Sequence, residues 1–236
     1  MLLISFLTAL GILGACAGVL LSRQIKRIHH LTSITGGLFL GMATFLILPE
    51  AFRSGPWPVV AIFLVAGCVS FAWVERTLHR SLDRGDSRIL TMPLPAIFGV
   101  IAVHNTLDGW NMGIALQISN SEFTRAFSIG MGLHKLIGGL AIGAMLRSAS
   151  RSASRNLIVA ATAEAVTLIG VAAERVLIAE MGHGWTVWFL AATGGSFLFL
   201  AFHALAEAKR GTNLNQTLWF GALGFAVVAT AALVHP

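Results

Sequence analysis

Long apolar stretches, separated by short polar or basic connections, run along almost the whole chain. Each stretch is close to the roughly 20 residues that an α-helix needs to cross about 30 Å of hydrocarbon. The apolar runs are continuous rather than alternating, which disfavours a transmembrane β-barrel. The pattern predicts eight transmembrane helices, whose ends are fixed to within about 2 to 4 residues. They cover residues 2–22, 31–51, 57–78, 93–117, 124–146, 156–178, 185–208 and 213–234.

Composition supports a membrane protein. The chain is 56% hydrophobic and 11% charged, whereas soluble domains carry roughly a quarter charged residues. We therefore expect an all-α, polytopic protein in which residues 1–236 form a single transmembrane domain surrounded by lipid. The net charge of +6 does not indicate a nucleic-acid partner, because the basic residues lie in short clusters between apolar segments.

The basic clusters instead predict the topology. Twelve basic residues lie at the connections after the first, third, fifth and seventh helices, namely Arg23, Lys26, Arg27, Arg76, Arg80, Arg84, Arg88, Arg147, Arg151, Arg155, Lys209 and Arg210. The alternate connections hold two, Arg53 and Arg125. Since basic loops stay on the cytoplasmic side, we expect a multi-pass protein of the cytoplasmic (inner) membrane with both termini on the outer side.

The second and seventh predicted helices share an internal similarity. Thr35-Gly36-Gly37-Leu38-Phe39-Leu40 is matched by Thr193-Gly194-Gly195-Ser196-Phe197-Leu198, and both helices end in Glu-Ala. On the predicted topology the two helices run in opposite directions. The first three and last three helices would then form an inverted repeat around helices four and five, an arrangement typical of transporters. Chance recurrence of Gly-Gly and Leu or Phe in apolar sequence is the alternative.

Polar residues gather near the middle of the central helices. The fourth helix contains His104-Asn105-Thr106-Leu107-Asp108-Gly109, in which His104 and Asp108 are four residues apart and project from one face, bordered by Asn105. The fifth contributes His134 and Lys135, and the sixth Glu164. Imidazole, carboxylate and amide groups suit a borderline divalent ion such as Zn²⁺.

Packing is the alternative explanation for each of these residues alone. A single histidine in an apolar helix is more often a hydrogen-bonded packing residue, and Asp108 could simply pair with Lys135. Two histidines, Asp, Glu and Lys at one membrane depth nevertheless exceed what packing requires, because buried ionisable groups are costly there. We therefore predict a metal site formed by His104, Asn105, Asp108, His134 and Glu164.

The fourth-helix motif resembles that of the ZIP (Zrt/Irt-like protein) family of divalent metal transporters, whose fourth and fifth helices carry His-Asn-x-Pro-Glu-Gly or His-Glu-x-Pro-Glu-Gly. The resemblance extends over nearly the whole chain. Residues 36–51 are similar to the family's second helix, Glu164 stands where its sixth helix carries a site glutamate, and His203 with Glu207 resembles its seventh. It implies eight helices in a three-two-three arrangement that import metal toward the cytoplasm, by an elevator-like movement of the site-bearing bundle.

Several positions depart from the family pattern. Leu107 replaces the motif proline, which leaves a break in the fourth helix in doubt. Lys135 stands where many members place a second-site ligand, and Gly138 where they place a bridging glutamate. We therefore expect a mononuclear site in which the Lys135 ammonium pairs with Glu164 or Asp108 in place of a second ion.

Three further polar residues lie toward the helix ends. On the predicted topology Glu50 lies near the outer end of the second helix, and His203 and Glu207 lie near the inner end of the seventh. They would form entry and exit steps for the metal. The equally weighted alternative is that the two glutamates have no transport role and simply extend to the membrane interface and cap their helices.

Zinc is the expected substrate, and Fe²⁺, Mn²⁺ or Cd²⁺ would suit the same ligand types. We expect no enzyme activity, since neither a His-Glu-x-x-His nor a Gly-x-Ser-x-Gly motif occurs. An intramembrane zinc hydrolase and a non-transporting metal-binding relative or sensor are the competing classes. The first, third and eighth helices carry few central polar groups, so they could face lipid or a homodimer partner.

Overall fold

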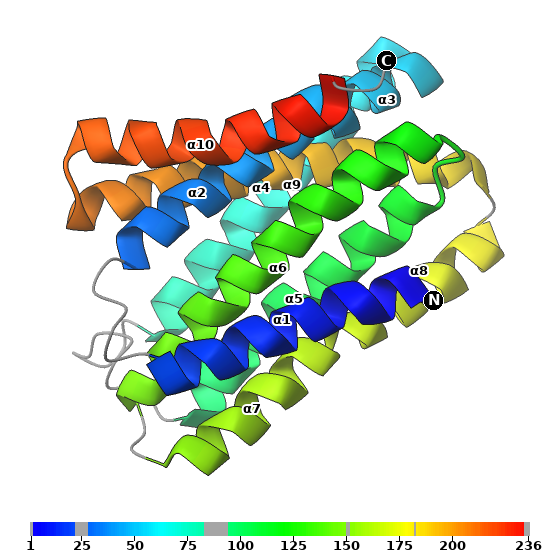
Figure 1. Ribbon diagram of the computed structural model, residues 1–236. Coiled ribbons are helices and arrows are strands. Elements are labelled where there is room, and N and C mark those ends of the chain that lie inside the picture. The colour runs from blue at the N-terminus through cyan, green and yellow to red at the C-terminus, as the bar shows by residue number, and fades with distance from the viewer. Residues whose placement is uncertain (1, 22–27, 83–93, 150–151, 182, 234–236) are drawn as a thin grey trace.

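The chain folds into a bundle of long helices, seen in the computed structural model in Figure 1. The structure describes residues 2–21, 28–82, 94–149, 152–181 and 183–233, and no strand occurs within these ranges. The helices are α1 (Leu2–Leu21), α2 (Ile28–Gly41), the π-helical η1 (Met42–Ile47), α3 (Leu48–Ser54), α4 (Trp57–Leu82), α5 (Leu94–Leu116), α6 (Ser121–Ala149), α7 (Ala153–Ala165), α8 (Thr167–Met181), the short 3₁₀ helix η3 (His183–Trp185), α9 (Thr186–Gly211) and α10 (Leu214–Leu233). The predicted all-α fold class is confirmed.

Within the described residues, seven segments are long and apolar enough to cross a membrane. Two of them are composite, because α2, η1 and α3 form one span and α7 with α8 forms another. The eighth helix is α5, which has 23 residues but carries the polar groups of the candidate site. The start of α1 and the end of α10 lie at the same end of the bundle as α3 (Figure 1). The structure is therefore that of a multi-pass membrane protein.

Close helix pairs build the bundle. The most extensive packing joins α1 to α6, α10 to α2, α4 to α9, α2 to α9 and α5 to α8. Glycines allow main chains to meet at these crossings. A side chain at Gly37 in α2 would collide with the carbonyl of Gly221 in α10, and one at Gly195 in α9 would collide with the carbonyl of Leu64 in α4.

Two spans depart from regular α-helix, each beside a residue of interest. The η1 segment lies just before Pro49, whose ring cannot fit against the carbonyl of a regular helix four residues earlier. The sixth span changes from α7 to α8 at Val166, between Glu164 and Thr167. By contrast α5 is continuous through Leu107, so the loss of the motif proline coincides with an unbroken helix.

The α5–α8 crossing fixes the position of the site, and we expect Gly109→Ala to weaken it. A methyl group at Gly109 would collide with the carbonyl of Thr167, which is main chain and cannot move aside. Overpacking of this kind typically costs about 1 to 3 kcal/mol, so thermal unfolding in detergent should begin at a lower temperature. Gly99→Ala is the matched control on α5, because nothing lies within 4 Å of a methyl group there. Equal melting temperatures for the two variants would contradict this packing.

Candidate metal centre

His104 and Asp108 on α5 and His134 on α6 form a cluster inside the bundle. One ligand atom from each residue lies within 4.8 Å of the other two. Asp108 and His134 are buried, with 2% and 3% of their surfaces exposed. The side chain of His104 is 34% exposed and is the accessible member of the cluster. Three residues from two helices therefore converge on one point, as the sequence predicted.

The two distances from Asp108 to the imidazoles are close to those between the ligand atoms of a tetrahedral ion. Asp108 Oδ2 lies 3.6 Å from His104 Nε2 and 3.2 Å from His134 Nε2. Donor atoms about 2.0 to 2.2 Å from a tetrahedral zinc are themselves about 3.3 to 3.5 Å apart. The shorter contact is also a hydrogen bond between His134 and Asp108. Three protein ligands with one open position is the arrangement of zinc sites that exchange a ligand.

Helix geometry and aromatic packing orient the two imidazoles. His104 precedes Asp108 by one turn of α5, which brings both side chains to one face. The ring of His134 packs on Phe39 of α2, with ring centroids 4.4 Å apart, and meets the His104 ring edge-on at 5.8 Å. Nδ1 of His134 has no hydrogen-bond partner among the described residues. Phe39 therefore holds this ring in place by packing.

Lys135 adds a buried positive charge beside the cluster. Its side chain is 2% exposed, and its ammonium lies 3.0 Å from Asp108 Oδ2 and 3.3 Å from Glu164 Oε2. It also donates hydrogen bonds to Asn105 Oδ1 at 2.7 Å and to Thr167 Oγ1 at 2.9 Å. The ammonium thus contacts both carboxylates between which the sequence left the choice open, and four oxygen atoms surround it.

Asn105 and Glu164 were predicted as metal ligands, and the structure directs both toward Lys135. The Asn105 amide donates to the carbonyl of Ala163 at 2.9 Å while its oxygen accepts from Lys135. Glu164 is buried beside Gly11 of α1, where a side chain would collide with its carboxylate. The site therefore has two halves that share Asp108, one formed by imidazoles and the other by oxygen atoms around an ammonium.

A cavity of about 400 Å³ extends from the imidazoles toward one end of the bundle. It lies between the beginnings of α2 and α5 and the later parts of α4, α6 and α9. Most of its wall is apolar, and its polar side chains are Thr32, Thr35, His104, His134 and His203. His203, one of the predicted pathway residues, thus lines the same cavity as the two imidazoles of the cluster.

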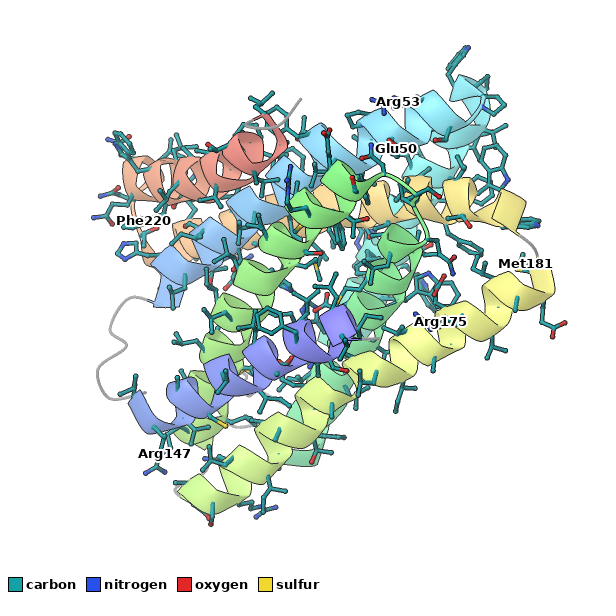
Figure 2. All side chains as sticks on the ribbon, turned by 45° about the vertical axis from the view of Figure 1, so that its right-hand side comes forward. Glu50, Arg53, Arg147, Arg175, Met181 and Phe220 are labelled. Carbon is teal, nitrogen blue, oxygen red and sulfur yellow. The ribbon has the colours of Figure 1, made fainter. Side chains whose placement is uncertain are left out.

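The two predicted pathway glutamates lie near opposite ends of the bundle. Glu207 is not among the described residues that line this cavity, and it pairs with Arg210 at 3.0 Å on the surface. Glu50 pairs with Arg53 at 3.2 Å and lines a separate cavity of about 140 Å³ together with Glu122 and Asn120. Figure 2 shows Glu50 and Arg53 at the end of the bundle opposite Arg147.

Two contacts in the site were not predicted. Thr167 accepts a hydrogen bond from Lys135, and its position three residues after Glu164 on the same helical face was the signal that could have identified it. Phe39 lies in the Gly-Gly segment of the second span, but nothing in the sequence indicates that its ring packs on His134.

Comparison with known proteins assigns no family. No protein-family model matches the chain, and no curated protein matches it. The cluster, the ammonium beside it and the cavity are the features that indicate a function.

Proposed function

We propose that this protein is a ZIP-like transporter that carries a divalent metal ion, zinc foremost, through a mononuclear site formed by His104, Asp108 and His134. The observation that carries the proposal is the buried convergence of these three ligands. Two neutral imidazoles and one carboxylate leave a bound divalent ion with a positive charge. An incomplete ligand set of this kind can release its ion, unlike the closed four-ligand set of a structural zinc site.

The cavity supplies one half of a transport path. His104, the exposed member of the cluster, lines its wall together with His134. Basic residues lie in the helix segments at this end of the bundle; those described are Arg76, Arg147, Arg155, Lys209 and Arg210. By the positive-inside rule this end faces the cytoplasm. The conformation then corresponds to a state open toward the cytoplasm, from which an imported ion would leave the site.

Lys135 explains why one ion is expected rather than two. Its ammonium neutralises part of the charge of Asp108 and Glu164 and occupies the oxygen cage formed with Asn105 and Thr167. A second divalent ion in the same cage would meet a fixed positive charge at contact distance. The Lys135 ammonium therefore takes the place that a second metal ion would occupy.

The packing of the helices supports an inverted repeat of transporter type. In such a repeat the spans formed by α1, α2–α3 and α4 correspond in order to those formed by α7–α8, α9 and α10, and α5 corresponds to α6. Under this correspondence the α10–α2 pair is equivalent to the α4–α9 pair, and the α1–α6 pair is equivalent to the α5–α8 pair. All four pairs are among the most extensive contacts. Gly37 and Gly195, which match in the internal similarity, each approach the main chain of the corresponding partner helix.

Zinc flux into vesicles that contain the purified protein tests the proposal. We expect entry of zinc, reported by a trapped dye, that depends on the protein and saturates with zinc concentration. Binding of zinc without flux would contradict transport and favour the non-transporting relative. Absence of both binding and flux would contradict the site itself.

His203 tests whether the cavity is the exit path. We expect His203→Ala to slow zinc flux about tenfold, the lower limit for losing a supporting ligand, while the affinity of the central site stays unchanged because His203 lies outside it. Glu207→Gln on the same helix is the control, since Glu207 lies at the surface beside Arg210. Flux at the wild-type rate in both variants would exclude His203 from the path.

A further inference from the structure

A third buried acidic group, Glu174 on α8, lies away from the metal cluster. Its surface is 0% exposed. Oε1 accepts a hydrogen bond at 3.4 Å from Gln117, the residue that follows α5, and Oε2 has no partner among the described residues. The carboxylate lies directly against Gly113, where a side chain would collide with it.

Two residues that contact Glu174, Gly113 and Gln117, line a cavity distinct from the one at the metal cluster. This cavity has a volume of about 380 Å³, and Gly113, Gln117 and Arg175 are among its lining residues. It lies where α5 and α8 approach their C-terminal ends and α1 begins, so Gly113 and Gln117 separate the buried carboxylate from open space. Figure 2 shows Arg175 on α8 at this level.

The groups around Glu174 favour a proton over a divalent metal ion as its ligand. No ion pair joins it to a basic residue in the described part of the chain, and the exposed Arg175 is the nearest charge, from α8 itself. Gln117, just after α5, is neutral, and α1 carries no charged side chain. A divalent ion would find one carboxylate, one amide and a repelling guanidinium, too few ligands for a metal site. A proton needs only the unpartnered oxygen.

We propose that Glu174 is a proton-binding site that exchanges its proton through this cavity and couples proton movement to metal flux. The coupling rests on the proposed transport function. It follows from the helices involved, because α5 carries both Asp108 and Gly113, against which the Glu174 carboxylate lies, and α8 continues the span that carries Glu164. A change of charge at Glu174 therefore acts on α5, which carries two of the three metal ligands, and on α8, whose Thr167 accepts a hydrogen bond from Lys135.

Infrared spectroscopy of the purified protein tests proton binding without any need for transport. We expect a carbonyl band of a protonated carboxyl group at neutral pH, which decreases as the pH rises. The band should disappear in Glu174→Gln and persist in Glu180→Gln, whose carboxylate is exposed on the same helix. Unfolding temperatures of both variants establish that they fold. A band that is unchanged in folded Glu174→Gln, or a carboxylate band at position 174 that shifts with added zinc, would overturn the proposal.

Zinc flux under an imposed pH gradient tests the coupling. In the wild-type protein we expect the rate to change with the gradient, and in Glu174→Gln this dependence should be lost while zinc binding to the metal cluster is retained. A variant that responds to the gradient as the wild type does would overturn the coupling. If the wild type transports no zinc, the proposed function fails, and the infrared result still decides whether Glu174 binds a proton.

Discussion

Asp108→Asn is expected to abolish zinc flux. The carboxylate is the only charged ligand in the described cluster, and its Oδ2 atom is the point at which His104, His134 and Lys135 converge. The substitution preserves the shape of the side chain but removes the negative charge that attracts the ion. Loss of even a supporting partner of a metal ligand costs about 10- to 100-fold in affinity, so we expect a loss beyond about 100-fold. Zinc binding by calorimetry and flux in vesicles should fall together.

Glu180→Gln is the matched control for this prediction, because it removes one carboxylate from an exposed position outside the cluster. It should bind and transport zinc as the wild type does. Normal flux in Asp108→Asn would show that the ion follows another route through the protein.

Lys135→Ala is expected to change the number of bound metal ions from one to two. The substitution removes the ammonium and leaves Asp108 and Glu164 facing each other, together with the Asn105 and Thr167 oxygens. Breaking a buried ion pair typically costs about 3 to 5 kcal/mol, so the metal-free variant should unfold at a lower temperature. Added zinc should restore much of this loss by binding in the oxygen cage. Calorimetric stoichiometry and melting curves check both parts.

Lys135→Arg is the appropriate control for charge, since it keeps a cation in the cage and should keep a single bound ion. A zinc-binding isotherm of Lys135→Ala that is identical to that of the wild type would contradict the role of the ammonium.

The helical spans were predictable because the bilayer makes hydrophobicity and length direct signals of structure. All eight predicted spans correspond to helical segments in the described residues. The irregular segments were not predicted. The π-helical turn before Pro49 and the change of helix at Val166 depend on which carbonyl groups find donors, and the hydrophobic pattern does not record this.

The candidate site was predictable in part. The spacing of His104 and Asp108 on one helix determines their common face, and the burial cost of polar groups predicted that His134 would join them. The sequence could not decide how the remaining polar groups divide between metal and lysine. This division depends on how far each side chain extends between α5, α6 and α7. The Lys135 side chain is long enough to donate hydrogen bonds to both Asn105 and Glu164. Glu174 was missed because it lies outside any recognisable motif.

The central claim is that His104, Asp108 and His134 coordinate one metal ion. Anomalous X-ray diffraction at the zinc edge, on crystals of the zinc-loaded protein, tests it most directly. We predict a single peak about 2.0 to 2.2 Å from Nε2 of both histidines and an oxygen of Asp108, with the Lys135 ammonium still between Asp108 and Glu164. A peak elsewhere in the bundle, or none near these three side chains at saturating zinc, would contradict the claim.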